Sequence, residues 1–293
     1  MTRDGLTRSV IAVDGGGSTC RLVLDGPGGR YLAERGSANV SSDFAAALGE
    51  IRTGLAALAA QAGTDLAGLA DVPAYVGLAG VTGPAKAEAV RAALPLARVR
   101  VEDDRRSALR GALGAHDGAI AHFGTGSFFA LQSGAELRLA GGWGSRLGDE
   151  GSGYWVVRSA LTETLASVDG LIAPSPLTEA LLAAYGSAAE IVARVAVETP
   201  RETARLAPEV AAAAAAGDPV GARILQEGAD HIALTLARMG WRDGMDLCLT
   251  GGFGPSYRDF LPDGLAEALV EPAGAPIDGA VALARAFAAE AAP

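Results

Sequence analysis

The sequence predicts an α/β protein made of two related halves. Short runs rich in Val, Ile and Leu alternate with longer segments of helical periodicity along the 293 residues, which is the pattern of mixed α/β folds. One local arrangement, an apolar strand, a glycine-rich turn with hydroxyl residues and a second strand, begins near residue 10 and again near residue 118. A chain of this length is also long enough for two domains.

The first half is expected to form strands and helices in alternation. Its strands are expected at residues 10–14, 20–25, 30–36, 74–80 and 98–104, and its helices at 41–63, 85–94 and 105–115. The helix at 41–63 begins at a capping pair, Ser42 and Asp43, and stops at Gly63. One apolar stripe runs along it, formed by Phe44, Leu48, Ile51, Leu55 and Leu58.

The second half is expected to repeat this beginning and then become helical. Strands are expected on either side of "FGTGS" within 118–132, at about 137–140, and within 245–254. A polar loop that starts at residue 141 leads into an alanine-rich, mostly helical middle from about 155 to 240. Gly217 ends one of its helices and another begins after Pro219. Residues 277–291 form the expected terminal helix.

Composition disfavours several classes of function. The formal charge of −10 argues against a general nucleic-acid binder and against docking on anionic membranes. No apolar run reaches the roughly 18 residues of a membrane helix, and Asp4 and Gly5 interrupt any secretion leader, so we expect a cytoplasmic protein. His116, His122 and His231 lack metal-ligand spacing, and His122 is expected to be a satisfied strand residue.

Lysine and cysteine usage narrows the classes further. Lys86 is the only lysine, so no Walker A ending of Gly-Lys-Ser/Thr exists, and its position indicates a helix surface rather than a pyridoxal phosphate site. Cys20 and Cys248 lie far apart without CxxC spacing. Neither a disulfide framework nor a zinc site is therefore expected.

Three glycine-rich turns carry the functional prediction. "DGGGST" at 14–19, "FGTGS" at 123–127 and "TGGFG" at 250–254 each directly follow an apolar strand. A lone glycine cluster is usually a tight turn, but the backbone N–H groups of such turns can also converge on an anion, and the repetition favours this second interpretation. Gly16 is expected to need a bare backbone and a positive φ. The dinucleotide fingerprint does not fit, because Cys20 stands where its third glycine would be.

Side chains beside these turns complete a predicted phosphate site. Ser18, Thr19, Thr125 and Ser127 add hydroxyl donors. Asp14, at the end of the first strand, could hold Mg²⁺ against a phosphate. We therefore expect a nucleoside triphosphate bound between two domains.

The three turns resemble the two phosphate motifs and the adenosine motif of the actin-like, sugar-kinase and Hsp70 ATPase superfamily. Within it, "GSAN" at 36–39, "AGGWGSRLGDEGSGYW" at 140–155 and "VETPRETARLAPEV" at 197–210 resemble glucosamine and N-acetylglucosamine kinases of the BadF/BadG/BcrA/BcrD-type ATPases. The resemblance spans about residues 9 to 289. It implies two ribonuclease-H-like domains around a central cleft, formed by residues 1–117 with 278–293 and by residues 118–277.

The resemblance also implies ligands and site residues. ATP with Mg²⁺ is the implied cofactor, an amino sugar the implied partner, and a homodimer the implied assembly. Phosphates would lie against Gly15, Gly16, Gly17, Ser18, Thr19, Gly124, Thr125, Gly126 and Ser127, adenosine against Gly251 and Gly252, and Mg²⁺ near Asp14 through water. The sugar would contact Asn39, Asp104, Thr125, Trp143, Gly144 and Asp149.

Asp104 is the predicted catalytic base. Phosphoryl transfer to a sugar hydroxyl needs in-line positioning, charge neutralisation and a base near the hydroxyl proton. Asp104 ends the strand at 98–104, where the resemblance also locates the catalytic Asp, although it could equally cap the following helix. Asp103 is expected to point the other way along the strand, and Arg105 leaves the local charge open.

The implied reaction is phosphorylation of glucosamine at its 6-hydroxyl, with N-acetylglucosamine as the alternative substrate. Carboxylates at Asp149 and Glu150 favour a protonated amine over an acetamide.

Two other functions fit less well. An ATP-driven reductase activator would need cluster-binding cysteines at helix ends, whereas Cys20 and Cys248 lie inside apolar strands, and a sugar-sensing repressor would need a helix-turn-helix ahead of the first strand.

Overall fold

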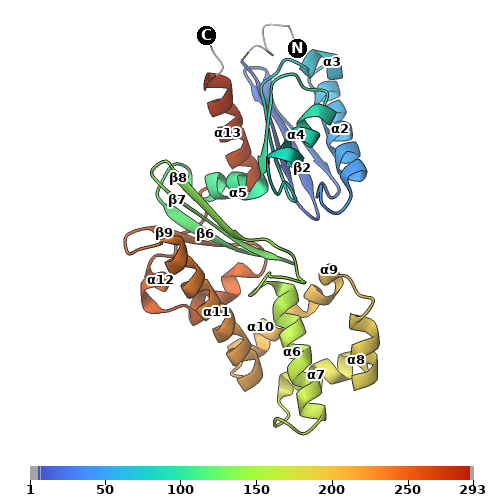
Figure 1. Cartoon of the computed structure of the whole chain (residues 1–293), viewed down its shortest axis with the longest axis vertical. Helices are drawn as coiled ribbons and strands as arrows, with labels where there is room; N and C mark the ends of the chain where they lie inside the picture. Colours follow the sequence, from blue (N-terminus) through green and yellow to red (C-terminus); the bar gives the residue numbers. More distant parts are fainter. Residues whose placement is uncertain (1–5, 7, 291–293) are drawn as a thin grey trace. The chain divides into compact units, whose positions relative to one another are not determined.

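The structure, a computed structural model, describes residue 6 and residues 8–290. The chain divides into two compact units, each built on one sheet (Figure 1). Unit 1 comprises Met1–Ala115 and Pro272–Pro293, and unit 2 comprises His116–Glu271. The last segment of the chain therefore returns to unit 1 from Pro272 onwards, earlier than the expected residue 278.

Unit 1 contains a five-stranded sheet in the order β3-β2-β1-β4-β5. Its strands are β1 (Val10–Gly15), β2 (Cys20–Gly26), β3 (Gly29–Arg35), β4 (Ala74–Leu78) and β5 (Val99–Asp103). The first three form an antiparallel meander, while β4 and β5 run parallel to β1. Parallel strands end at the same edge of a sheet, so the first glycine turn and the end of β5 lie at one edge, on either side of the end of β4.

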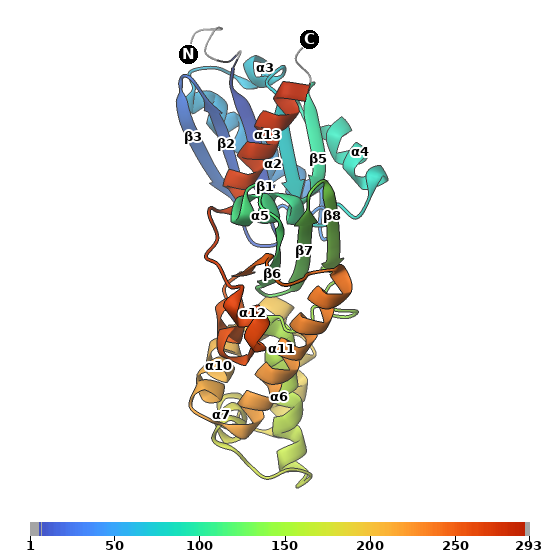
Figure 2. The ribbon, with the colours of Figure 1, turned by 90° about the vertical axis from the view of Figure 1, so that its left-hand side faces the viewer.

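Helices cover both faces of this sheet. One face packs against α2 (Phe44–Gln61), α3 (Leu66–Leu69) and α4 (Pro84–Ala93), and the other against α5 (Asp104–Leu113) and α13 (Pro276–Glu290), as Figure 2 shows for α13. Alternate residues of β1 pack into the hydrophobic cores on the two faces of the sheet, because successive side chains of a strand point to opposite faces. Ile11 and Val13 contact the α2 side, and Val10 and Ala12 contact the α13 side.

Helix α2 forms for the expected reasons. Asp43 caps it, with its carboxylate accepting a hydrogen bond from the Ala46 amide at 2.9 Å. The stripe residues Leu48, Ile51, Leu55 and Leu58 are buried, whereas Phe44 is half-buried. Gly63 follows the end of the helix with φ +70°, which glycine adopts without strain. The short helix α3 was not among the expected elements.

Unit 2 repeats the sheet of unit 1 with one strand fewer. Its order is β8-β7-β6-β9, formed by β6 (Gly118–Phe123), β7 (Ser127–Ser133), β8 (Glu136–Gly141) and β9 (Asp246–Thr250). β6, β7 and β8 form an antiparallel meander and β9 runs parallel to β6, as β4 does to β1. The burial pattern along β6 and β7 is the same as along β1 and β2. The predicted repetition of the two halves is confirmed.

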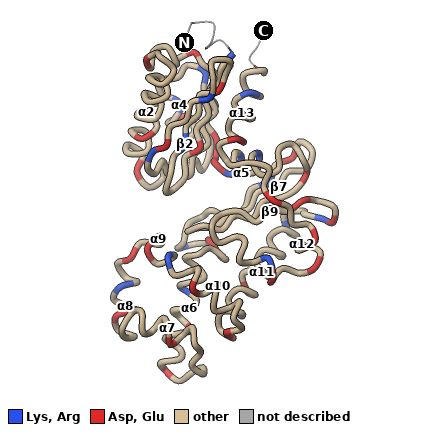
Figure 3. Tube along the Cα trace, turned by 180° about the vertical axis from the view of Figure 1, so that it is seen from behind, with Lys and Arg blue, Asp and Glu red and all other residues tan. Residues whose placement is uncertain are grey.

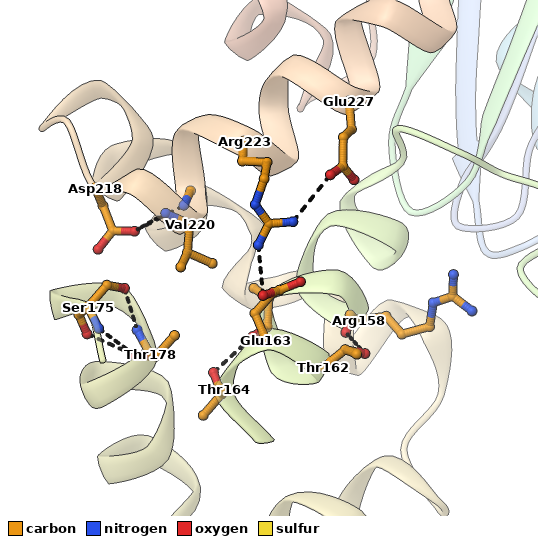
Figure 4. A network of polar contacts seen from close by, with 12 residues as sticks. Arg158, Thr162, Glu163, Thr164, Ser175, Thr178, Asp218, Val220, Arg223 and Glu227 are labelled. Atoms are coloured by element: carbon orange, nitrogen blue, oxygen red, sulfur yellow. Dashed lines mark hydrogen bonds and ion pairs between the residues drawn. The ribbon is translucent and has the colours of Figure 1, made fainter. Parts of the chain in front are cut away.

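The rest of unit 2 is helical. Its helices are α6 (Gly153–Val168), α7 (Pro176–Tyr185), α8 (Ala188–Val195), α9 (Pro200–Thr203), η1 (Ala204–Leu206), α10 (Ala207–Ala215), α11 (Pro219–Met239), η2 (Gly254–Phe260) and α12 (Asp263–Glu267). A polar network joins α6, α7 and α11 (Figure 4). Asp218 caps α11 and also accepts a hydrogen bond from the Leu177 amide of α7, and Arg223 pairs with Glu163 of α6 at 2.7 Å.

Charged residues are distributed over both units, with Lys and Arg interspersed among the more numerous Asp and Glu (Figure 3). Within residues 6 and 8–290, no helix is both long enough and apolar enough to cross a bilayer.

Candidate functional site

The first glycine turn is held in shape by three backbone hydrogen bonds. The Gly16 amide donates to the Thr19 carbonyl at 2.9 Å and closes the turn on itself. The Ala79 amide donates to the Gly15 carbonyl at 2.8 Å, and the Ala38 amide donates to the Gly16 carbonyl at 3.1 Å. The turn is therefore a preformed part of the sheet edge.

The three glycines of this turn are bare for different reasons. A Cβ on Gly15 would lie 2.5 Å from Leu78 Cδ2 and 2.9 Å from Ala38 Cβ, so packing alone requires glycine there. A Cβ on Gly16 would lie 3.6 Å from the Thr19 carbonyl, and one on Gly17 would meet no described atom within 4 Å. Neither residue has a positive φ, so the expected left-handed backbone at Gly16 is wrong. Protein contacts do not account for Gly16 and Gly17, which leave an open backbone surface.

Asp14 stands directly before this turn as a half-buried carboxylate. Burial raises its pKa to about 6, although the Ser107 hydroxyl and the charge of Arg21 oppose that shift. Ser107 Oγ lies 3.3 Å from Asp14 Oδ1 and 2.8 Å from the Asp104 carbonyl oxygen. A carboxylate with so little compensating charge is suited to a nearby cation.

Two adjacent carboxylates at the end of β5, Asp103 and Asp104, have different surroundings. Asp103 caps α5 by accepting from the Arg105 amide at 3.0 Å, and it also binds the Arg105 guanidinium at 2.7 and 2.8 Å. Asp104 is therefore the first residue of α5 rather than its cap. Burial, followed by the charges of Asp103 and Asp14, raises the pKa of Asp104 to about 7, against the opposing charge of Arg105. Asp104 thus titrates near neutral pH, as a general base requires.

Asn39 lies in the loop beside the end of β4. Its side-chain oxygen accepts hydrogen bonds from the amides of Ser41 at 2.9 Å and Ser42 at 3.3 Å. Gly80 approaches this oxygen with φ +86°, and a Cβ there would lie 2.6 Å from it. The amide group of Asn39 is thereby fixed in orientation at the same sheet edge as the first turn, since the Val40 amide donates to the Ala79 carbonyl at 3.1 Å.

The second glycine turn joins β6 to β7 in unit 2. The Gly124 amide donates to the Gly126 carbonyl at 2.9 Å, and the Gly124 carbonyl accepts from the Gly153 amide at 2.9 Å. A Cβ on Gly126 would lie 2.7 Å from Asp149 Oδ2, whereas one on Gly124 would make only an ordinary 3.6 Å contact with His122. Thr125, half-buried between these glycines, forms the tip of the turn.

The third turn lies beside the second, because β9 pairs with β6. The Phe253 amide donates to the Phe123 carbonyl at 2.9 Å. Gly251 has φ +78° and lies against the Phe123 backbone, so both conformation and packing require glycine. A Cβ on Gly252 would meet no heavy atom within 4 Å among the described residues. Gly252 is therefore the open glycine of this turn, as Gly16 and Gly17 are of the first.

A loop of residues 141–151, here called the tryptophan loop, follows β8. Trp143 and Leu147 expose 69% and 86% of their surface, so Trp143 is not a core residue. Asp149 is buried, and Ser152 rather than Asp149 or Glu150 caps α6, accepting from the Trp155 amide at 3.2 Å. The carboxylate of Asp149 is thus available for contacts other than a helix cap.

The structure groups the predicted residues within each unit. In unit 1, residues 14–19, Asn39 and Asp104 lie at the edge where β1, β4 and β5 end. In unit 2, the second and third turns and the tryptophan loop lie together. Sequence reasoning missed Ser107, although its place one helical turn after Asp104 was a usable indication.

The residues near Asp14 fit Mg²⁺ better than a metal held wholly by protein. Among the described residues, no three His, Cys, Asp or Glu side chains gather into a metal site. Mg²⁺ usually keeps several waters and binds through one or two carboxylates and substrate phosphates. One half-buried carboxylate beside an open glycine turn satisfies that requirement.

Both cysteines are free, buried strand residues. Burial raises the pKa of the Cys20 thiol to about 12 and that of Cys248 to about 11. They lie in β2 and β9 rather than at helix ends. This placement does not favour a shared cluster site.

Comparison with solved structures identifies the fold. The chain has a TM-score of 0.85 and 33% identity to a candidate N-acetylglucosamine kinase from Chromobacterium violaceum, covering 94% of this chain and 99% of that one. A ROK family glucokinase from Streptomyces griseus, solved with glucose and AMPPNP, matches at a TM-score of 0.54 and 19% identity, covering 95% and 99% of the two chains. The two units thus form the two-domain actin-like ATPase fold expected from the sequence.

Sequence comparisons agree. The chain is 28% identical over 279 residues to the glucosamine kinase GspK of Vibrio cholerae, covering 92% of this chain and 94% of that relative. An N-acetylmuramic acid/N-acetylglucosamine kinase of Clostridium acetobutylicum is 31% identical over 147 residues, 48% of each chain. The model of the BadF/BadG/BcrA/BcrD ATPase family matches residues 11–284, so the expected resemblance is confirmed and the chain belongs to this family.

Proposed function

We propose that this protein is an ATP-dependent amino-sugar kinase that phosphorylates glucosamine at its 6-hydroxyl. The observation that carries the proposal is Asp104, a half-buried carboxyl with a pKa of about 7 at the sheet edge that also bears the first glycine turn. Because Asp103 caps α5 and binds Arg105, the carboxylate of Asp104 is not needed for either task.

In the proposed reaction Asp104 is the general base. The sugar O6 attacks the γ-phosphorus of ATP, the new O6–P bond forms, and the bond between the γ-phosphorus and the β,γ-bridging oxygen breaks to release ADP. The hydroxyl proton passes to Asp104. A base with a pKa near 7 holds an ionised fraction at neutral pH and still accepts a proton readily.

The open glycines are the proposed phosphate contacts. Gly16 and Gly17 in unit 1 and Gly124 in unit 2 leave backbone surface that no described side chain fills tightly. Ser18, Thr19 and Thr125 add hydroxyl groups at these turns, and Gly252 is the open glycine proposed to lie against adenosine. Mg²⁺, held through water near Asp14, would supply neutralisation of phosphate charge when bound.

The proposed sugar contacts allow two substrates. Asp149 and the exposed Glu150 supply carboxylates, which favour the protonated amine of glucosamine. Trp143 and Leu147 supply exposed apolar surface on the same loop, which favours the methyl group of N-acetylglucosamine. We place glucosamine first because a full-length curated relative is a glucosamine kinase, and N-acetylglucosamine second.

A coupled ADP-release assay across a panel of hexoses with saturating Mg-ATP tests the proposal. We expect the highest kcat/KM for glucosamine. A preference for N-acetylglucosamine of more than about tenfold, or about 1.4 kcal/mol, would instead establish the second substrate. Turnover at background level with every hexose would refute the kinase proposal.

A further inference from the structure

Ser127, the residue that ends the second glycine turn, is bound to the tryptophan loop through two polar groups. Its hydroxyl donates to the Glu150 carbonyl at 2.8 Å. Its carbonyl accepts from the Gly142 amide at 2.9 Å. The Ser127 hydroxyl therefore donates its hydrogen bond within unit 2. This bond holds the loop and is not donated to a ligand.

Asp149 lies in the loop, beside the second turn. Burial raises the pKa of its carboxyl, and the amides of Ser127 in the second turn and Gly144 in the loop oppose that shift. A Cβ on Gly126 would lie 2.7 Å from Asp149 Oδ2, which shows how closely the carboxylate lies against the turn.

The cost of this arrangement indicates that the surrounding structure imposes it. Asp149 has φ +62° and is the only residue other than glycine with a positive φ among those that the structure describes. Its surface is 7% exposed, and burial raises its pKa. A backbone of this kind is strained for a residue other than glycine and persists only where the surroundings fix it.

We propose that Asp149 and Ser127 couple sugar binding to nucleotide binding. The inference rests on the proposed function, in which the second turn contacts phosphate and the tryptophan loop contacts the sugar. A ligand that fixes either segment then fixes the other through this shared carboxylate and hydroxyl. By linkage, sugar must raise nucleotide affinity by the same factor as nucleotide raises sugar affinity.

The coupling is measured by calorimetry on the full chain. ADP is titrated with and without saturating glucosamine, for the wild type and for Asp149→Asn, Ser127→Ala and Ser127→Thr. We expect sugar to tighten ADP binding by about 5-fold or more in the wild type. Asp149→Asn and Ser127→Ala should reduce that factor to below about twofold, and Ser127→Thr, which keeps the hydroxyl, should restore it. Ser145→Ala on the same loop is the matched control.

Hydrogen exchange of the ligand-free protein separates this inference from the proposed function. Asp149→Asn should speed amide exchange in both 124–130 and 141–148, and Ser145→Ala should leave the first segment unchanged. If Asp149→Asn weakens only sugar binding, while coupling and exchange at 124–130 stay as in the wild type, Asp149 is a sugar ligand alone and the inference is wrong. Absence of turnover with every hexose overturns the kinase proposal, whereas the exchange result still decides whether the two segments are joined.

Discussion

The hairpin β1–β2 of unit 1 and the hairpin β6–β7 of unit 2 have the same burial pattern and different chemistry. Asp14 of β1 and His122 of β6 occupy the same position, one residue before the strand ends. Asp14 pairs in register with Arg21 and Gly77, and His122 pairs with Phe128 and Thr250. One framework therefore carries an ionisable carboxylate in one unit and a neutral ring in the other.

The surroundings explain the difference in charge state. Burial raises the pKa of Asp14 to about 6 and lowers that of His122 to about 4, because it disfavours the charged form of each. His122 stacks on Phe128 at 4.6 Å and bonds Thr250 Oγ1 at 3.1 Å, as expected of a satisfied strand residue. We infer that, of the two hairpins, β1–β2 supplies an ionisable carboxylate at this position and β6–β7 supplies none.

The largest expected effect follows from removing the carboxylate of Asp104 in unit 1. Asp104→Asn should reduce kcat by about 10²–10⁴, the usual contribution of a general base, while sugar binding and folding remain. Steady-state kinetics with a calorimetric check of sugar affinity would measure this. Turnover close to the wild type would mean that another group accepts the proton.

Asp103→Asn is the matched control for that variant. It removes the charge that pairs with Arg105, while the Asn side-chain oxygen can still cap α5 and the proposed base stays in place. We expect a loss of stability of up to about 1 kcal/mol and a reduction in kcat much smaller than that of Asp104→Asn.

The second prediction compares the packed and open glycines of the first turn. Gly16→Val should weaken ATP binding at least about 10²-fold with little loss of stability, because a Cβ there makes only an ordinary 3.6 Å contact with the Thr19 carbonyl but the side chain occupies the proposed phosphate space. Gly15→Ala should do the reverse and destabilise unit 1 by about 1–3 kcal/mol through its clash with Leu78. ATP calorimetry and urea unfolding of both variants would test the distinction, and unchanged ATP affinity in Gly16→Val would contradict the phosphate contact.

The pH dependence of turnover gives the third prediction. Asp104 must be ionised to accept a proton, and burial raises its pKa to about 7. At saturating substrates, kcat should therefore fall about tenfold per pH unit below 7 and reach a plateau above it. In Asp104→Asn, the fall in kcat below pH 7 should be absent. A wild-type profile flat from pH 5 to 8 would exclude Asp104 as the base.

The sequence predicted the repeated sheets because their determinants are local. Alternating apolar residues and glycine turns specify β1–β2 and β6–β7, and Asp43 with Gly63 specifies the ends of α2. The sequence did not predict the short helices α3, η2 and α12, because each has too few residues to show the helical spacing of apolar side chains.

The chemistry of the site was less predictable where it depends on non-local contacts. The sequence left open whether Asp104 caps α5, since the answer depends on how the chain leaves β5 and on the contact of Asp103 with Arg105. It also could not show that the Ser127 hydroxyl donates to the carbonyl of Glu150, because that residue lies 23 residues away in the chain. The positive φ of Asp149 follows from the same long-range contacts.

The fourth prediction is that acid changes the contributions of Asp104 and His122 to stability in opposite directions. The folded-state pKa of Asp104 is about 7, above its ordinary value of 3.8, so its contribution to unit 1 stability falls as pH rises through that interval. The folded-state pKa of His122 is about 4, below its ordinary 6.5, so its contribution to unit 2 stability falls as pH drops through that interval.

Hydrogen exchange at pH 4.5 and 7, corrected for intrinsic rates, would measure this for segments 99–113 and 118–133. Lowering the pH should protect the first segment relative to the second. Asp104→Asn should reduce the dependence in unit 1 to the part that Asp14 contributes, since burial raises that pKa as well. It should leave the dependence of unit 2, since the pKa shift of His122 arises in a different unit. Equal changes in both segments would contradict the prediction.

The smallest expected effect concerns the hydrogen bond between His122 and Thr250. Thr250→Val preserves the shape of the side chain but removes the hydroxyl 3.1 Å from His122 Nδ1, leaving a buried ring nitrogen without that partner. Unfilled hydrogen bonds of this kind cost about 1–3 kcal/mol, so urea unfolding should show a loss of this size with kcat unchanged. A fall in kcat as large as that of Asp104→Asn would mean that the His122 position contributes to catalysis as Asp14 is proposed to do, and the division of chemistry between the two hairpins would be wrong.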